Sequence, residues 1–411
     1  MQTTLDNEIN QRALALEAKL IAWRRDFHQH PELSNRENRT AKIVAEHLQS
    51  LGLVVQTSVA RTGVVAILQG ARPGPVVALR ADMDALPVAE QVDLPFASTT
   101  KAEYEGGQAG VMHACGHDAH TAILMAVAEI LVGLKDKLAG SVKFIFQPAE
   151  EGPPNGEEGG AALMIKEGVL ENPRPEAIFG LHVIAGMATG KIAYRPGATM
   201  ASGDTIRIKV QGRQTHGAFP WQGVDPVVLA SQIVLGLQTI PSRQVDVTLE
   251  PSVLTISCIH GGVRSNIIPD HVELLGTMRT FNEAMRADIR ERIKITAEKI
   301  AESGGGNAQV NIEKDYDVTI NDHGLTEKMA PTLDRVAGLG NTFIAPKLTG
   351  SEDFSKYQQV IPGFFFFVGI TPPDEKHAAP NHSPHFRIDE SGLKLGVRAL
   401  AQLAVDYLDH S

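Results

Sequence analysis

The stretch Val142-Lys143-Phe144-Ile145-Phe146-Gln147-Pro148-Ala149-Glu150-Glu151 joins a short apolar run to a polar turn. Its β-branched and aromatic residues predict a buried strand at 142–146, and the turn follows where that strand ends. Similar apolar runs predict further strands on both sides of it, at residues 64–68, 76–79, 177–182 and 364–369.

Helical patterns lie between these strands. Helices are predicted at 6–28, 118–134 and 161–167, after residue 317, and from about residue 390. Another helix is expected to begin at Ser34, because Ser34-x-x-Glu37 has the spacing of a capping box, and to end before Gly52. Strands that alternate with helices are typical of a mostly parallel sheet covered on both faces. The first half of the chain is therefore expected to be an α/β domain.

The order of the predicted elements changes after residue 201. Strands at 205–210, 252–260, 271–280 and 308–313, with helices at 225–240 and 283–302, follow in the order β-α-β-β-α-β. This order matches the ferredoxin-like unit, which is large enough to form its own domain. We therefore expect an α/β catalytic domain over 1–201 and 317–411, interrupted by an inserted ferredoxin-like α+β domain over 202–316.

Composition narrows the possible classes of protein. The 411 residues are 43% hydrophobic and 21% charged, which describes a folded globular chain. A net charge of −10 disfavours nucleic acid and anionic membrane surfaces as partners. The N-terminus is polar and no stretch of about 18 apolar residues occurs, so the protein is expected in the cytoplasm. Only Cys115 and Cys258 are available, too few for a disulfide framework.

Residues 113–120 place three histidines, one cysteine and one aspartate in the segment that enters a predicted helix. Cys115-x-His117 can aim a thiolate and an imidazole at one metal ion. Two other interpretations stay open at this point. The segment could hold a satisfied loop histidine beside a small buried thiol, or a cysteine nucleophile paired with a histidine.

The pair Glu150-Glu151 follows a buried strand, at the kind of position where open α/β sheets build their sites. One carboxylate could bind a metal while its neighbour, facing the other way, handles the proton of a metal-bound water. The alternative is a solvated acidic turn. Asp84 also lies near a strand end and could orient a ligand histidine. His182 and His382 lie at comparable strand or loop ends, although either alone is more often structural.

With these residues in view, the chain resembles the M20 metallopeptidases, in particular the amidohydrolase branch of hippurate hydrolases, N-acyl-amino-acid deacylases and plant auxin-conjugate hydrolases. The resemblance covers nearly the whole chain. It rests on ten ordered motifs, at residues 26–32, 80–87, 113–120, 147–152, 180–182, 215–217, 266–269, 276–279, 350–354 and 381–384. One departure is the stretch 152–159, which is longer than the short glycine-rich segment expected after the glutamate pair.

The resemblance implies a metallopeptidase-like site with two divalent metal ions. It assigns as metal ligands Cys115, His117, Glu151, His182 and His382. It implies Glu150 as general base, Asp84 as an orienting aspartate, and His216 and Asn266 as groups that hold the oxyanion. Arg279 and the Gly350 turn are implied near the substrate carboxylate. The inserted domain is implied to mediate a homodimer, in which His216 is supplied across subunits.

The predicted reaction is metal-dependent hydrolysis of the amide bond of N-acyl-L-amino acids, which are small-molecule substrates. A thiolate ligand favours zinc or another first-row transition ion, so zinc or manganese is expected, with cobalt or nickel as alternatives. A dipeptidase or carboxypeptidase of the same superfamily is the nearest rival. A cysteine hydrolase that uses Cys115 and a metal-holding binding protein without turnover are more distant alternatives.

Overall fold

The computed structural model describes residues 2–409, so residues 1, 410 and 411, at the outer ends of the first and last predicted segments, lie outside it. The chain divides into two compact units. The first comprises residues 1–197, 320–346 and 356–411, and the second comprises 198–319 and 347–355. Within residues 2–409, no helix has both the length and the apolar character needed to cross a bilayer.

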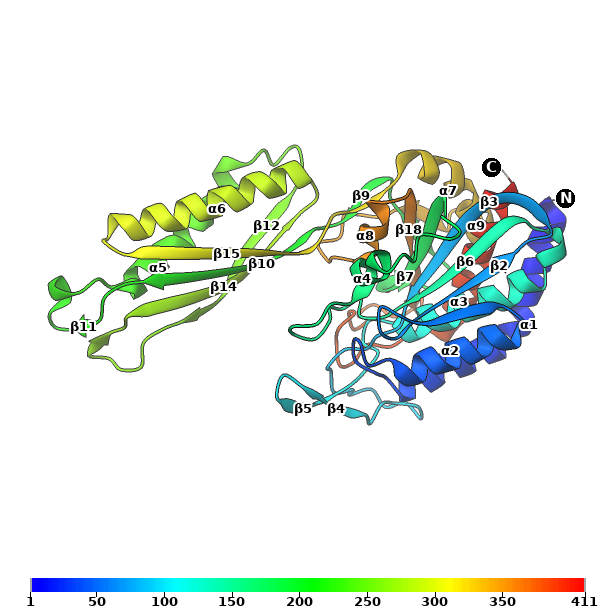
Figure 1. Ribbon diagram of the computed structural model, residues 1–411, viewed down its shortest axis with the longest axis horizontal. Helices are drawn as coiled ribbons and strands as arrows, with labels where there is room; N and C mark the ends of the chain where they lie inside the picture. The colour runs from blue at the N-terminus through cyan, green and yellow to red at the C-terminus, as the bar shows by residue number, and fades with distance from the viewer. Residues whose placement is uncertain (1, 410–411) are drawn as a thin grey trace. The chain divides into compact units, whose positions relative to one another are not determined.

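A mixed sheet forms the middle of the first unit (Figure 1). Within the described residues it has eight strands, in the order β1 (Val54–Val59), β2 (Gly63–Gln69), β6 (Ala139–Gln147), β3 (Arg72–Asp82), β7 (Ala177–Ala188), β18 (Gly363–Thr371), β8 (Ile192–Tyr194) and β17 (Thr342–Ile344). The central strands β6, β3, β7 and β18 run parallel, as the alternating pattern predicts. Strands β1, β2 and β8 add antiparallel pairings toward the edges, and β1 and β2 are joined by a short connection.

Both faces of the central strands are covered. All nine residues of β18, including the run Phe364–Phe367, are buried, and a strand buried on both faces reads as a continuous apolar run. Helices α3 (His117–Val132) and α9 (Leu393–Asp409) pack on β3, β6 and β7, and α1 (Gln2–Gln29) packs on α3 and α9. Other helices are α2 (Asn38–Ser50), α4 (Gly160–Lys166), α7 (His323–Ala337) and α8 (Phe354–Gln358). Other short strands are β4 (Lys101–Tyr104), β5 (Gly107–Gly110), β9 (Gly197–Met200) and β16 (Thr319–Asn321).

The parallel register brings the predicted site segments to one edge of the sheet. Asp82, at the end of β3, lies beside Gln147, at the end of β6. The segments that follow β3 and β6 leave the sheet side by side. Asp84 therefore lies next to the turn that carries Glu150. Carboxyl ends of neighbouring parallel strands are where open α/β sheets build their sites.

The second unit contains a four-stranded antiparallel sheet in the order β12 (Ser252–His260), β14 (His271–Thr280), β10 (Gly203–Gln211) and β15 (Asn307–Tyr316). Helices α5 (Pro226–Leu237) and α6 (Glu283–Ser303) pack on this sheet. The chain order is β-α-β-β-α-β, and β10, the first strand, lies inside the sheet, as in the ferredoxin-like unit. Residues 347–355, expected in the catalytic part, group with this unit because Ala201 N donates to the carbonyls of Leu348 and Gly350, both at 3.0 Å.

The predicted capping box is wrong. Helix α2 begins at Asn38 rather than after Ser34, its N-cap residue is Glu37, and the Glu37 side chain does not cap it. The Glu32 carboxylate instead accepts from two N–H groups of the first turn, those of Arg39 at 2.9 Å and Thr40 at 2.8 Å. The Ser34 hydroxyl donates to Asp84 Oδ2 at 2.7 Å, and the Glu37 carboxyl is buried among other partners. The spacing fits a capping box, but the side chains of Ser34 and Glu37 are buried and bind other partners.

Candidate active site

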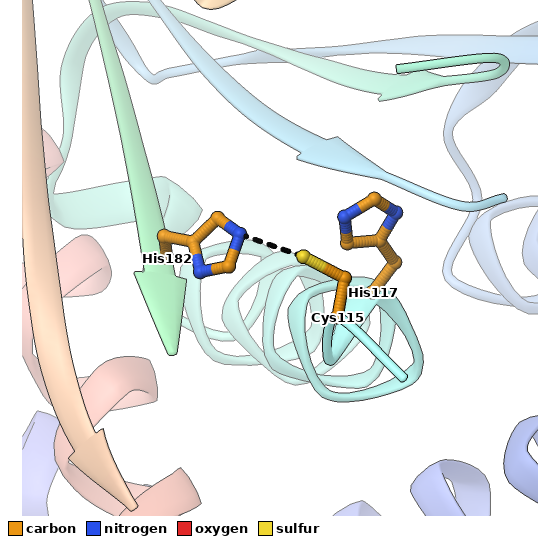
Figure 2. A group of neighbouring side chains, drawn as sticks. All are labelled: Cys115, His117 and His182. Atoms are coloured by element: carbon orange, nitrogen blue, oxygen red, sulfur yellow. Dashed lines mark hydrogen bonds between the residues drawn. The ribbon is translucent and has the colours of Figure 1, made fainter. Parts of the chain in front are cut away.

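Cys115 and His117 are held by a tight loop at the start of α3. Gly116 between them has φ +101°, and a Cβ there would come within 2.4 Å of Val183 Cγ2, so only glycine fits. Figure 2 shows the Cys115 sulfur between the rings of His117 and His182. Cys115 Sγ lies 3.3 Å from His182 Nε2, and the ligand atoms of the three residues lie within 4.8 Å of one another. A loop and a strand far apart in the sequence thus meet at one point.

A second group shares the same thiol. His382 Nε2 lies 3.3 Å from Cys115 Sγ and 3.2 Å from Glu151 Oε1. Cys115, Glu151 and His382 again place ligand atoms within 4.8 Å of one another. His382 has a left-handed backbone, φ +70°, and its N–H donates to Ala114 O at 2.8 Å. The five side chains that the sequence predicts as ligands therefore gather around Cys115.

The ligand imidazoles are oriented by hydrogen bonds on their far sides. His182 Nδ1 donates to Val183 O at 2.7 Å, and His117 Nδ1 lies 3.3 Å from Asp84 Oδ1. Both rings therefore turn Nε2 toward the centre, the arrangement that partner groups impose on metal-binding histidines. Within residues 2–409, His117 Nε2 is buried without a hydrogen-bond partner. A buried, partnerless imidazole nitrogen beside a thiol and a carboxylate is a donor set that fits a first-row transition ion.

The surroundings of Cys115 and His382 favour the protonated forms of both side chains. Burial, and next the Glu151 carboxylate, raise the pKa of the Cys115 thiol. Hydrogen bonds to Cys115 and then to Glu151 raise the pKa of His382 to about 10. Burial opposes ionisation of Asp84, but the hydrogen bond and charge of His117, together with the hydrogen bond from Ser34, lower the pKa of that carboxyl. Cation binding at this centre must therefore release protons, which makes affinity fall at low pH.

The two carboxylates of the glutamate pair face the same centre. Glu150 Oε2 and Glu151 Oε1 each lie 3.9 Å from His117 Nε2. The prediction that Glu150 faces away from Glu151 is therefore wrong. It assumes that side chains alternate as along a strand, whereas the preceding residue, Ala149, has φ +53° and turns the chain. Glu150 is buried, as a group that exchanges protons away from bulk water would be.

The four residues predicted to contact the oxyanion or the substrate carboxylate form two pairs within the second unit, although Gly350 was predicted in the second part of the catalytic domain. His216 lies on β11 (Thr215–His216), which pairs with β13 (Ile267–Ile268), and Gly217 N donates to Asn266 O at 2.9 Å. His216 and Asn266 are thus neighbours. Arg279 on β14 donates from Nη1 to the hydroxyl of Ser351, the residue after Gly350. The five ligand candidates, with Glu150 and Asp84, belong to the first unit.

Four residues that support the site are not among its predicted residues: Asp82, His120, Asn381 and Glu37. Asn381 Nδ2 donates to Cys115 O at 3.0 Å, and Asn381 Oδ1 accepts from Ala185 N at 3.1 Å, so its side chain joins the segments that carry the ligands. Asp82 Oδ1 lies 2.6 Å from His120 Nδ1, and Val183 N donates to His120 Nε2. The motifs at 80–87, 113–120 and 381–384 contain the first three of these residues. The spacing of Glu37 from Ser34 instead suggests a helix cap.

A pocket of about 450 Å³ opens beside Glu151. Its lining includes apolar side chains from four separate segments, namely Leu33, Leu86, Pro87, Tyr104, Pro153 and Pro154. Gly152 and Asn155 also line it, so the long stretch after the glutamate pair shapes this pocket. A volume of this size suits a small molecule.

The comparisons with known proteins agree with this geometry. The sequence profile of peptidase family M20/M25/M40 matches residues 78–406. Thermostable carboxypeptidase 1 of Saccharolobus solfataricus is 38% identical over 98% of both chains. N-acetylcysteine deacetylase of Bacillus subtilis is 37% identical over 96% of this chain and 98% of its own. The solved structure of the Bacillus subtilis YXEP protein, described as a dinuclear metal-binding peptidase of family M20, matches with TM-score 0.80 and 35% identity over 97% and 99% of the chains.

The family profile covers most of the chain, and these relatives match it over nearly its whole length. The donor set around Cys115 and the glutamate pair beside it are what a metal-dependent hydrolase requires. The chain is an enzyme that hydrolyses amide bonds, and it belongs to peptidase family M20/M25/M40.

Proposed function

We propose that this enzyme removes the acyl group from N-acyl-L-amino acids by metal-dependent hydrolysis, as a deacylase or a hippurate-hydrolase type of amidohydrolase. The observation that carries the proposal is the position of Glu150. Its buried carboxylate lies as close to His117 Nε2 as the ligand candidate Glu151 does, 3.9 Å in both cases. A pure metal-binding site has no need of a spare carboxylate beside its ligands.

Two divalent ions would be held by Cys115, His117, Glu151, His182 and His382. Cys115 belongs to two groups of candidate ligands, one with His117 and His182 and one with Glu151 and His382, which supports a site for two ions. Zinc or manganese is the proposed metal, with cobalt or nickel as alternatives, because thiolate and imidazole ligands select against magnesium and calcium. When bound, the ions would polarise the amide carbonyl and make a water molecule acidic near neutral pH.

The side chains of this chain would then move the proton. Glu150 accepts it from the attacking water and passes it to the leaving amine, first as general base and then as general acid. Asp84 holds His117 in position from the far side of its ring and keeps Nδ1 protonated. Glu150 and Asp84 are tied to each other, since Glu150 N donates to Asp84 Oδ1 at 3.1 Å.

The substrate would be recognised at both of its ends. The apolar walls around Leu33, Leu86 and Tyr104 suit the acyl group, because they line the pocket that opens beside Glu151. Arg279 and the Gly350 turn, neighbours within the second unit, suit the α-carboxylate. His216 and Asn266 would stabilise the oxyanion. We further propose a homodimer through the inserted part and a cytoplasmic location, without nucleic acid or membrane as partners.

A substrate panel tests the function. Acetyl, benzoyl and indole-acetyl amino acids are offered beside dipeptides to metal-reconstituted protein, with the Glu150→Gln variant as a matched control. Hydrolysis of the acyl amino acids, abolished by chelation and by Glu150→Gln, supports the proposal. Hydrolysis of dipeptides alone would establish the second candidate function, a dipeptidase or carboxypeptidase, which the identity to the Saccharolobus solfataricus carboxypeptidase favours.

The more distant alternatives give other patterns. A cysteine hydrolase would be inactivated by iodoacetamide and unaffected by removal of the metal. Metal uptake without turnover of any amide would indicate a binding protein. Both outcomes would contradict the proposed reaction.

A further inference from the structure

Glu37 is a buried carboxyl that none of the roles described so far uses. Its side chain has no exposed surface, and it comes from the turn before α2, more than one hundred residues from the glutamate pair. Oε1 accepts two backbone N–H groups, from Ala149 at 2.9 Å and from Asn35 at 3.0 Å. Oε2 lies 2.5 Å from the hydroxyl of Thr62. Both oxygens of Glu37 are therefore engaged.

The Ala149 contact lies at the start of the catalytic turn. Ala149 has φ +53°, in the left-handed region that is unfavourable for residues other than glycine. The next two N–H groups, of Glu150 and Glu151, both donate to Asp84, at 3.1 Å each. Three successive N–H groups thus end on two buried carboxyl groups. Glu37 secures the first of them, the one whose backbone conformation is least favourable by itself.

We propose that Glu37 is a positioning residue for Glu150 and Glu151, acting through the Ala149 backbone. This inference rests on the proposed function, which gives those two glutamates their roles as base and ligand. Glu37 itself touches neither glutamate side chain in the contacts described. By holding Ala149 in the left-handed region, it directs both following carboxylates toward His117 instead of to opposite sides of an extended chain.

The positioning role of Glu37 depends on a side chain long enough to reach Ala149 N and on an oxygen that accepts its hydrogen bond. It does not depend on negative charge. Glutamine keeps the Oε1 acceptor for Ala149 and Asn35, and its amide can donate to the Thr62 hydroxyl, which accepts as well as donates. Aspartate keeps the charge but is one methylene shorter, so it cannot reach Ala149 N from the same backbone position. The two conservative substitutions therefore separate a positioning role from an electrostatic one.

The experiment compares Glu37→Gln and Glu37→Asp in the full-length, metal-reconstituted enzyme. Affinity for Mn²⁺ or Zn²⁺, kcat, KM and melting temperature are measured for each. Glu37→Gln is expected to stay within about threefold of the wild-type kcat. Glu37→Asp is expected to lose about 10- to 100-fold in kcat with little change in KM, since displacing catalytic groups by about 1 Å has effects of this size, and to bind the metal more weakly. The opposite ranking of Gln and Asp would overturn the proposal.

Thr62→Val is the matched control. It removes the partner of Oε2 and leaves the contacts of Oε1 to Ala149 and Asn35 in place. It is expected to lower the melting temperature while kcat stays near the wild-type value. If Thr62→Val lost as much turnover as Glu37→Asp, Glu37 would have only a structural role and the proposal would fail.

Two further outcomes are decided by the same measurements. If Glu37→Asp does not fold, Glu37→Gln decides, because a loss of more than about tenfold in its kcat contradicts a role based on the acceptor oxygen. If the wild type hydrolyses no N-acyl amino acid, the proposed function fails. Metal affinity still tests Glu37 in that case, since equal affinity in wild type and folded Glu37→Asp would show that Glu151 is not positioned by Glu37.

Discussion

Glu150 and Glu151 are the same side chain at adjacent positions, so the different roles proposed for them must come from their surroundings. Glu151 Oε1 lies 3.2 Å from His382 Nε2, within the group formed by Cys115, Glu151 and His382. Glu150 is the more deeply buried of the two and is absent from that group, although it forms another group of possible ligands with His117 and Glu151. The first position thus suits proton transfer and the second suits metal binding.

We expect Glu150→Gln to retain its metal and to lose about 10²- to 10⁴-fold in kcat, because the amide is nearly isosteric but cannot take a proton. Glu151→Gln should instead weaken metal binding. Metal content by elemental analysis, measured together with kcat for both variants, checks the pair. Exchanged phenotypes would mean that the base and the ligand have been assigned the wrong way round.

Glu37 also has a consequence for pH-dependent stability. Burial, and next the charge of Asp84, raise the pKa of Glu37 from 4.5 to about 8. The folded protein then holds this proton more tightly than the unfolded chain, so the stabilisation is full below pH 4.5 and is lost as the pH rises through about 8. Arg36 also interacts with Glu37, and its positive charge favours the ionised form of the Glu37 carboxyl.

Metal-free Glu37→Gln cannot ionise at this position and should escape that loss. Between pH 4.5 and 8, its free energy of unfolding is expected to rise relative to that of the wild type, by at most about 5 kcal/mol. Urea unfolding of both proteins at intervals of one pH unit measures the difference. A difference that does not change with pH would show that Glu37 is ionised throughout this range.

At the scale of single elements, a buried ion pair joins strand β10 to helix α6. Asp204 on β10 accepts from Arg286 Nε at 2.8 Å and from Arg290 Nη1 at 2.9 Å, and the Asp204 and Arg286 side chains are at most 1% exposed. Arg286 Nη1 also lies 3.1 Å from Glu283 Oε1 and 3.0 Å from Asp317 Oδ1, so loss of the Asp204 charge weakens two buried hydrogen bonds but leaves Arg286 with other carboxylate partners. This pair therefore couples the first strand of the second unit to its longer helix.

Asp204→Asn is expected to reduce the stability of the second unit by about 1–3 kcal/mol, because Arg286 keeps its pairs with Glu283 and Asp317. Asp288→Asn, in the same helix, is the control, because its pair with Arg292 is partly exposed and should contribute little to stability. Urea unfolding, with hydrogen exchange of the β10 amides as a local probe, measures both. Equal effects of the two substitutions would contradict the distinction between buried and exposed pairs.

At the scale of the whole molecule, the candidate site residues are divided between two units. His216 belongs to the second unit and the ligand candidates belong to the first. An oxyanion donor on a separate unit can be supplied by the same chain or by a second subunit, and the proposed homodimer favours the second subunit. Losing one such donor costs on the order of 10²- to 10³-fold in turnover.

We expect His216→Ala to bind metal normally and to be nearly inactive. Mixing it with inactive Glu150→Gln protein, under conditions that exchange subunits, should restore part of the activity, because one site of a mixed dimer then has both wild-type residues. Native mass spectrometry verifies the exchange and a turnover assay measures the recovery. Verified exchange without recovered activity would place the action of His216, if any, within its own chain.

The sequence by itself determined the type of each main element and the candidates for chemistry. Apolar runs and helical periodicity are local, so the central strands and the β-α-β-β-α-β order could be predicted from them. Cys115, His117 and Glu151 stand out as polar residues at strand and loop ends, whereas His182 and His382 were assigned as ligands through the resemblance to the M20 metallopeptidases. Strands β8 and β17, three residues each, and the β4–β5 hairpin were too short to leave a pattern.

Only the tertiary structure decided how the polar side chains are paired. Ser34 and Glu37 have the spacing of a helix cap, yet one bonds to Asp84 and the other to Ala149. Glu150 and Glu151 would alternate on a strand, yet the left-handed conformation of Ala149 turns both toward His117. A buried carboxyl must find hydrogen-bond donors wherever the fold supplies them, and here those donors come from distant parts of the chain. No local pattern can encode such a partner, which is why the supports of the glutamate pair became visible only in three dimensions.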